Sequence, residues 1–160
     1  MVDHLTPARR SWNMSRIRGM NTSPERLVRR CAYCRGLRYR THVMSLPGRP
    51  DMVFTAARVV VFIDGDFWHG WRFSKWCARL SPYWRAKIER NRRRDRNNFQ
   101  RLRRAGWHVV RIWEHDLARG AEASVDRIVH ALRHAMMHPQ PAPKPTIAKR
   151  KRSTATGMSA

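Results

Sequence analysis

Two aspartates stand at the ends of two short apolar segments, where they could take part in metal-dependent chemistry. Asp51 opens the segment 51–55, and Asp64 closes the segment 58–64 after a Val-Val-Val-Phe-Ile core. If the two segments pair as a hairpin, both carboxylates come to the same end of a sheet. They would repel each other there unless a cation lies between them, and hard divalent ions prefer oxygen ligands. The spacing alone leaves two interpretations open, a metal site or ordinary turn residues at strand ends.

A third carboxylate, Asp95, falls on the apolar side of a predicted long helix. This helix is expected over residues 81–105, with an apolar stripe that includes Ile88 and Phe99. Asp95 lies seven residues after Ile88 and therefore on the same stripe. Because a buried carboxylate is costly unless it is paired, Asp95 should point inward at a partner. That partner is either a buried arginine or a histidine of a functional site.

An earlier helix places a glutamate close to its start. Ser23, Pro24 and Glu25 give a cap residue, a proline at the first helical position and an acid in the first turn. Glu25 could simply interact with the helix dipole. It could also share the inward face of the helix, since Val28 and Ala32 follow three and seven residues later.

The remaining elements predict an α/β fold. The β-branched run 59–63 is typical of a strand buried on both faces, and the alternating segment 107–113 predicts a further strand after the long helix. A strand–helix–strand step favours parallel pairing. We also expect a short strand over 38–43, a loop over 65–70 and a last helix over 121–137, and we assign no element to 71–80. These elements form one domain over 23–138, between a basic arm (1–22) and a flexible basic tail (139–160).

Charge restricts the classes of partner. The 160 residues include 34 Lys and Arg against 11 Asp and Glu, for a formal net charge of +23. Such a chain seeks polyanions, and nucleic acid is the default partner. A membrane partner is disfavoured, because no helix joins a basic face to a broad apolar one and no apolar run reaches the roughly 20 residues of a span. Three cysteines and an N-terminus without the apolar core of a signal peptide lead us to expect an intracellular protein.

Longer motifs make the sequence similar to a known family. The segments 46–51 (LPGRPD), 62–69, 87–91 with Asp95, 106–107 and 112–114 resemble the very short patch repair endonucleases over residues 11–118. The resemblance implies a restriction-endonuclease-like fold, with a mixed central sheet flanked by helices. It also implies a Mg²⁺-dependent enzyme that nicks one strand of double-stranded DNA next to a T·G mismatch. We further expect a monomer that works with other repair proteins in the bacterial cytoplasm, in association with the nucleoid.

The resemblance also assigns roles to individual residues. By analogy, Asp51 and the backbone carbonyl of Ile63 bind the metal, His69 is the general acid or base, and Asp95 orients it. Glu25 matches an acid that acts near the metal through its water shell. The residues matched to DNA contacts are Phe67, Trp68 and Trp84, which would wedge into the duplex, and Arg49, which would meet phosphates.

Two departures from the family pattern alter these expectations. Asp64 stands where the pattern has histidine, so it resembles the second metal-binding carboxylate of the wider nuclease superfamily. Many members also carry a structural zinc, but here Asp66, Trp71 and Phe73 occupy ligand positions and His115 alone remains, so we expect no zinc. Two alternatives therefore stay open, a restriction-type or nicking endonuclease that acts on unmismatched DNA and a non-catalytic basic DNA-binding protein.

Overall fold

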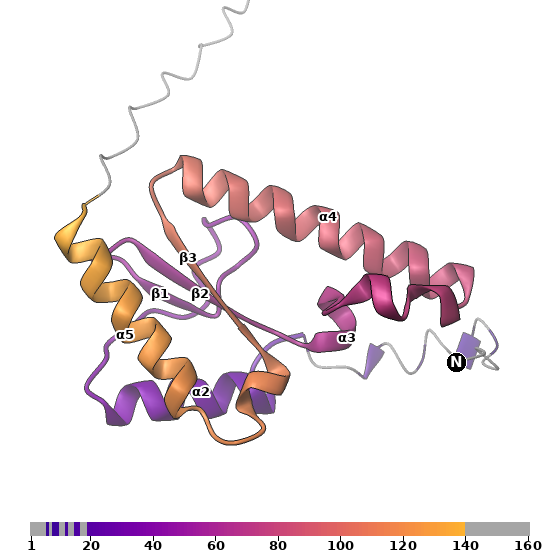
Figure 1. The fold of residues 1–160 in the computed structure, drawn as a ribbon, viewed down its shortest axis with the longest axis horizontal. Helices are drawn as coiled ribbons and strands as arrows, with labels where there is room; N and C mark the ends of the chain where they lie inside the picture. The colour runs from indigo at the N-terminus through magenta and orange to yellow at the C-terminus, as the bar shows by residue number, and fades with distance from the viewer. Residues whose placement is uncertain (1–5, 7, 10–11, 13–14, 17–18, 140–160) are drawn as a thin grey trace, which may run out of the picture.

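A computed structural model describes residues 6, 8–9, 12, 15–16 and 19–139, and its centre is a three-stranded mixed sheet. The strands are β1 (Met52–Phe54), β2 (Val59–Asp64) and β3 (His108–Trp113), in that spatial order. β1 runs antiparallel to β2, and β3 runs parallel to it (Figure 1). The predicted α/β class with a mixed sheet is therefore confirmed, and each strand bound lies within one residue of its prediction.

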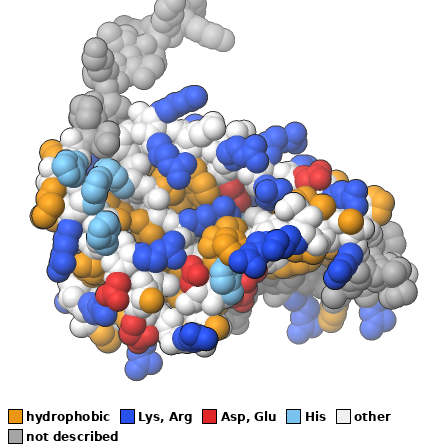
Figure 2. Space-filling view, in the orientation of Figure 1, with side chains coloured by type: hydrophobic (Ala, Val, Ile, Leu, Met, Phe, Trp, Pro, Cys, Tyr) orange, Lys and Arg blue, Asp and Glu red, His pale blue; other side chains and the backbone are white. Residues whose placement is uncertain are grey.

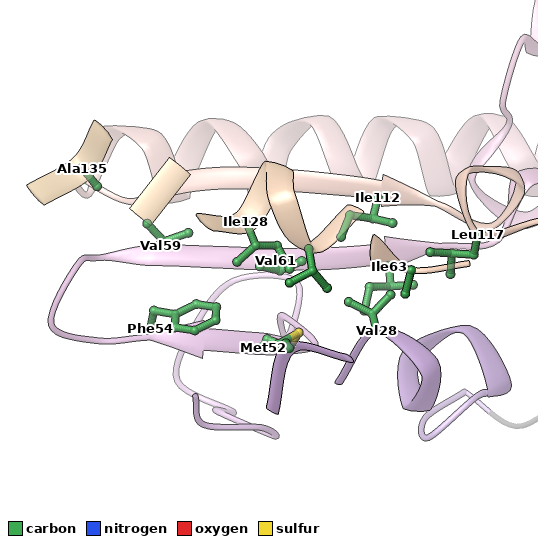
Figure 3. Packing of buried hydrophobic residues seen from close by; sticks show 13 residues of the cluster. Val28, Met52, Phe54, Val59, Val61, Ile63, Ile112, Leu117, Ile128 and Ala135 are labelled. Atoms are coloured by element: carbon green, nitrogen blue, oxygen red, sulfur yellow. The ribbon is translucent and has the colours of Figure 1, made fainter. Parts of the chain in front are cut away.

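Helices cover both faces of the sheet, so all six residues of the central strand β2 are buried. On one face lie α2 (Ser23–Cys34) and α5 (Glu122–Met137), and on the other lies the long helix α4 (Pro82–Arg104) (Figure 1). Val59, Val61 and Ile63 pack in the cluster shown in Figure 3, together with residues of α2 and α5. Val60 and Phe62 point to the opposite face and pack against α4. The two ends of β2 are consequently fixed from both sides.

Two local predictions differ from the structure, and a segment without a predicted element turns out to be ordered. The expected strand over 38–43 is reduced to a single bridge between Arg40 and Val53, because His42 takes a left-handed backbone conformation with φ of 56° and breaks the extended chain. The expected loop over 65–70 contains a short helix, α3 (Asp66–His69), which ends at Gly70. The unassigned segment 71–80 forms two 3₁₀ turns, η1 (Phe73–Lys75) and η2 (Cys77–Arg79).

The outer edge of β3 is closed by side chains. Among the described strands, β3 has a neighbour on one side only. On its other side the Asp116 carboxylate, in the turn η3 (Glu114–Leu117), accepts a hydrogen bond from the Trp113 N–H at 3.1 Å. Arg127 of α5 donates to the Arg111 carbonyl at 2.6 Å and pairs with Asp116 at 2.9 Å. The C-terminal half of this edge is thus already hydrogen-bonded.

The terminal predictions fall largely outside the described residues. Most of the expected basic arm (1–22) and nearly all of the expected tail (139–160) belong to the undescribed part of the chain. Within the described part, no helix has both the length and the apolar character needed to cross a bilayer.

Gly70 holds α3 against α4 and offers a test of this packing. Its φ of 69° lies in the left-handed region, and an added Cβ would lie 2.7 Å from Arg92 Cδ and 3.1 Å from Ile88 Cγ2. We expect Gly70→Ala to lower the free energy of unfolding by about 2–3 kcal/mol, from backbone strain plus overpacking. Urea denaturation measures this loss.

Gly36→Ala is the matched control. Gly36 has a φ of 78°, but no atom lies within 4 Å of an added Cβ. The control should lose only the conformational part, about 1 kcal/mol. Equal losses in the two variants would contradict the close packing of α3 on α4.

Candidate active site

The predicted site residues gather in one cleft at the end of the sheet where β2 ends. The cleft has a volume of about 860 Å³. Its lining includes nearly all the residues singled out in the sequence, which are Glu25, Arg49, Asp51, Ile63, Asp64, Trp68, His69 and Asp95. They come from α2, the segment before β1, the end of β2, α3 and α4, so the fold unites segments that are up to 70 residues apart.

Asp51 lies just before β1 and has no cationic side-chain partner within the described residues. Its Oδ2 accepts the backbone N–H of Ile63 at 2.7 Å, and its own N–H donates to the Val61 carbonyl at 2.9 Å. Burial raises the pKa of Asp51 to about 7; the Ile63 hydrogen bond and the charge of Arg29 oppose this rise, while the charges of Glu25 and Asp64 add to it. A partly buried carboxylate near two other acids is suited to a cation.

Glu25 is buried at the start of α2, in agreement with the inward-facing alternative. Its carboxylate forms a capping box with Thr22 and pairs with Arg29 at 3.0 Å. Arg29 also donates to the backbone carbonyl of Asp51 at 3.1 Å. Glu25 therefore serves the helix end and faces the cleft at the same time, and Arg29 links it to the Asp51 backbone.

His69 and Asp95 form a close side-chain pair in the cleft. His69 Nδ1 lies 2.6 Å from Asp95 Oδ2. Burial would raise the pKa of Asp95, but the hydrogen bond and charge of His69, with Arg94 and Arg111, keep it below its usual value. The helix stripe left Arg and His open as partners for Asp95. The structure shows both, since Arg111 Nη2 also lies 3.8 Å from Asp95 Oδ2.

Asp64 is engaged by two side chains at the end of β2. Its Oδ2 accepts a 2.5 Å hydrogen bond from Arg111 Nε, and its Oδ1 lies 3.4 Å from His69 Nε2. Burial raises the pKa of Asp64, while the positive charges of His69 and Arg111 oppose this rise. The two carboxylates of the hairpin, Asp51 and Asp64, thus have different surroundings.

Aromatic residues form a continuous cluster beside the cleft. The Phe67 ring contacts Trp68 at a centroid distance of 5.1 Å, and both rings lie 5.7 Å from Trp84. Phe67 is 37% exposed, and Trp68 reaches the cleft itself. Lys87 lies over the rings of Trp68 and Trp84 at 5.6 and 5.4 Å. The three predicted wedge residues are brought together next to an ammonium group.

Basic side chains surround this site. Arg49 is exposed and lines the cleft, with a left-handed φ of 54°. Figure 2 shows Lys and Arg side chains over the visible part of α4, with few acidic groups among them. Such a surface is suited to a phosphate backbone.

The four positions that correspond to the zinc site of the family, Asp66, Trp71, Phe73 and His115, contact one another or the core. His115 Nδ1 pairs with Asp66 Oδ1 at 2.7 Å, and the Trp71 ring lies 4.5 Å from the His115 ring. Phe73 is buried. Among the described residues, no group of three or more His, Cys, Asp and Glu side chains is arranged to hold a metal.

Sequence reasoning missed three polar contributors, Arg29, Asn91 and Arg111. The Asn91 amide donates to the Trp68 carbonyl at 3.0 Å and ties α3 to α4. Arg111 interrupts the apolar alternation of β3, which was the available signal for a buried charge. Arg29 had no comparable signal, because it is one of many arginines on helices.

A mixed sheet that presents a partly buried carboxylate without an ion pair among the described residues, and a His–Asp pair in the same cleft, is consistent with the restriction-endonuclease-like class. Comparison with known proteins makes this more specific. Residues 2–75 match the family described as "DNA mismatch endonuclease Vsr". The chain belongs to this family and is a DNA endonuclease.

Individual relatives agree with this assignment. The type II nicking enzyme V.XorIIP of Xanthomonas oryzae is 41% identical over 74% of this chain and 88% of its own length. The type II nicking enzyme V.NmeDIP of Neisseria meningitidis is 36% identical over 82% of this chain and 91% of its own. The DNA mismatch endonuclease Vsr of Escherichia coli is 38% identical over 79% of this chain and 81% of its own.

The raised pKa of Asp51 predicts a pH-dependent stability difference. Between its ordinary value of 3.8 and about 7, the folded protein holds a proton at Asp51 that the unfolded chain releases. The contribution of this group to stability therefore falls as pH rises through that window. Asp51→Asn removes the effect. The free energy of unfolding of this variant should therefore exceed that of the parent protein by an amount that grows from pH 4 to 7 and then levels off at up to about 4 kcal/mol.

Urea denaturation with a chelator present measures this gain at each pH. The exposed Asp126, changed to Asn, serves as the control and should show no such trend. A gain for Asp51→Asn that does not vary with pH would contradict the placement of the Asp51 carboxylate.

The His69–Asp95 pair predicts a rate effect. Asp95→Asn keeps the shape but loses the charge that fixes the ring of His69, so we expect DNA cleavage to slow by about 10²-fold or more. Single-turnover kinetics on a labelled duplex that the parent protein cleaves measures the change. Glu89→Gln removes an exposed carboxylate from the same helix and should cleave at the parental rate; comparable rates for both variants would argue against the pair.

Proposed function

We propose that this endonuclease nicks one strand of duplex DNA next to a T·G mismatch, in a Mg²⁺-dependent reaction of very short patch repair. The observation that carries the proposal is the partly buried carboxylate of Asp51, which forms no ion pair among the described residues, in the same cleft as the His69–Asp95 pair. The aromatic cluster beside that cleft supports the choice of a distorted duplex as substrate. Work on chromosomal DNA in the bacterial cytoplasm, as a monomer alongside other repair proteins, belongs to this proposal.

The chemistry of the donor set at Asp51 fits a hard cation. Its carboxylate is partly buried and lies near two further acids, a combination that a divalent ion relieves. Asp51 and the backbone carbonyl of Ile63 would hold Mg²⁺, and Glu25 would act through the water around it. When bound, the ion supplies polarisation of the scissile phosphate and stabilises charge on the leaving oxygen. The role of Asp64 as a second ligand stays a prediction.

His69 is the residue that handles a proton. Asp95 holds Nδ1, which leaves Nε2 directed toward Asp64. A fixed imidazole can accept a proton from an attacking water or return one to a leaving group near neutral pH. His69 lies on α3 and Asp95 on α4. Because α3 packs on α4, the position of Asp95 determines the position of the His69 ring.

The aromatic cluster and the arginines would bind and deform DNA. Phe67, Trp68 and Trp84 present apolar rings next to Lys87, a combination that can enter a weakened base step while the ammonium group meets a phosphate. Opening a mismatched step costs less than opening a paired one. Arg49 and the exposed arginines of α4 would contact the phosphate backbone.

A related activity on unmismatched DNA is the second candidate. Relatives described as type II nicking enzymes favour it, and Asp64 departs from the family pattern. The third alternative, a non-catalytic basic DNA-binding protein, is disfavoured by family membership and by the joint presence of Asp51, His69 and Asp95. Positive charge alone would suffice for binding.

Nicking of two labelled duplexes, one with a single T·G mismatch and one fully matched, tests the proposal. With Mg²⁺, the parent protein should nick only the mismatched duplex, and EDTA should abolish the reaction. Asp51→Asn should lose cleavage by about 10³-fold or more while it binds DNA within about threefold of the parent. Equal cutting of both duplexes would select the second candidate.

Metal binding has a readout that does not depend on cleavage. Mg²⁺ should raise the thermal midpoint of the parent protein and leave that of Asp51→Asn unchanged, because a ligand stabilises only the state that binds it. The control Asp126→Asn should respond like the parent. An equal shift in all three proteins would place the ion elsewhere.

A further inference from the structure

Arg111 is a partly buried charge in the middle of a strand. Its neighbours on the same face of β3 are Val109 and Trp113, and the face packs against α4. The guanidinium lies 4.0 Å from the centroid of the Trp113 ring and 5.2 Å from that of Phe99. Two aromatic side chains therefore hold a group that could otherwise move toward solvent, as a planar guanidinium permits.

This guanidinium connects two carboxylates of the active site. Its Nε donates to Asp64 Oδ2 at 2.5 Å, and its Nη2 lies 3.8 Å from Asp95 Oδ2. Both acids also approach His69, Asp95 at Nδ1 and Asp64 at Nε2. Arg111 thus contacts the same two carboxylates that flank the imidazole ring of His69.

We propose that Arg111 is a positioning residue that engages Asp64, so that Asp64 helps to orient His69 instead of binding the metal ion. One oxygen of Asp64 is taken by Arg111, and the other faces His69. The Asp64 residue is only 4% exposed, which leaves little surface for a third partner. Asp51, by contrast, accepts a backbone N–H and forms no ion pair in the described part of the chain; the charge of Arg29, which binds the Asp51 backbone carbonyl, acts on its carboxylate from a distance.

The proposal follows from how charge is compensated. A carboxylate already neutralised by an aromatic-bound guanidinium gains less from a divalent ion than an uncompensated one. Removal of the guanidinium would free Asp64 to turn away from His69. In the parent protein, where the guanidinium is present, Asp51 is the metal-binding carboxylate, and Asp64 and Asp95 lie on the two sides of the imidazole.

Mg²⁺ titrations of nicking activity test this assignment. This test rests on the proposed function, because it measures Mg²⁺-dependent nicking. Asp64→Asn and Arg111→Met should each lower kcat by about tenfold or more, with the half-saturating Mg²⁺ concentration kept within about threefold of the parent value. Asp51→Asn provides the contrast, a loss of metal-dependent activity. An increase of about tenfold or more in half-saturating Mg²⁺ for Asp64→Asn would show a lost ligand and overturn the proposal.

A double variant separates positioning from folding. Arg111→Met alone strands a buried carboxylate, so it should lower the thermal midpoint, whereas Asp64→Asn with Arg111→Met should restore it. The double variant should remain slow, because nothing holds His69 from that side. Recovery of kcat along with stability would mean that the pair is merely structural. The exposed pair Arg35–Asp126, changed to Met and Asn, is the matched control and should leave kcat at the parental value.

The ring of His69 gives a readout without metal or substrate. Long-range ¹H–¹⁵N spectra of the metal-free protein should show altered His69 ring signals in Arg111→Met and parental signals in Arg35→Met. Unchanged signals in Arg111→Met would overturn the proposal even if nicking is lost. Altered signals in a protein that never nicks DNA would support the positioning role while the proposed function fails, so the two failures are distinguishable.

Discussion

Five carboxylates line one cleft, and the site depends on the way the charge of four of them, Glu25, Asp51, Asp64 and Asp95, is compensated. Three of them have cationic partners, and the pairs are Glu25 with Arg29, Asp64 with Arg111 and Asp95 with His69. Asp51 has a backbone N–H instead. Burial of four unpaired acids at such close range would be prohibitive, so the pairs allow the cleft to exist. The uneven compensation then separates one carboxylate, suited to a metal ion, from three that hold other side chains in place.

Much of the fold followed from hydrophobic periodicity. The run 59–63 is apolar at every position because β2 is covered by α4 on one face and by α2 and α5 on the other. The strand–helix–strand order gave the parallel pairing of β2 and β3. Asp95 was expected to face inward because it breaks an apolar stripe, and the structure confirms it. In each case a long periodic segment decided the outcome, as local patterns report burial well.

Features set by single backbone angles or by tertiary contacts were not predictable in this way. A positive φ at His42 ends the extended chain where composition indicated a strand, and α3 forms in a segment of aromatic residues with little helix signal. The partner of Asp64 was missed for another reason. Arg111 interrupts the apolar alternation of β3, but only its place next to the end of β2 shows that its partner is Asp64. Charge composition indicates a polyanionic partner but does not identify which cations are internal.

The capped edge of β3 has a consequence for the behaviour of the protein in a crowded cell. A strand with unpaired backbone groups is a template for the addition of a strand from another chain, which leads to aggregation. Asp116 and Arg127 already occupy such groups at Trp113 and Arg111. The last residues of β3 are therefore a poor template for a strand from another chain. Protection from self-association is thus built from an ion pair in place of a fourth strand.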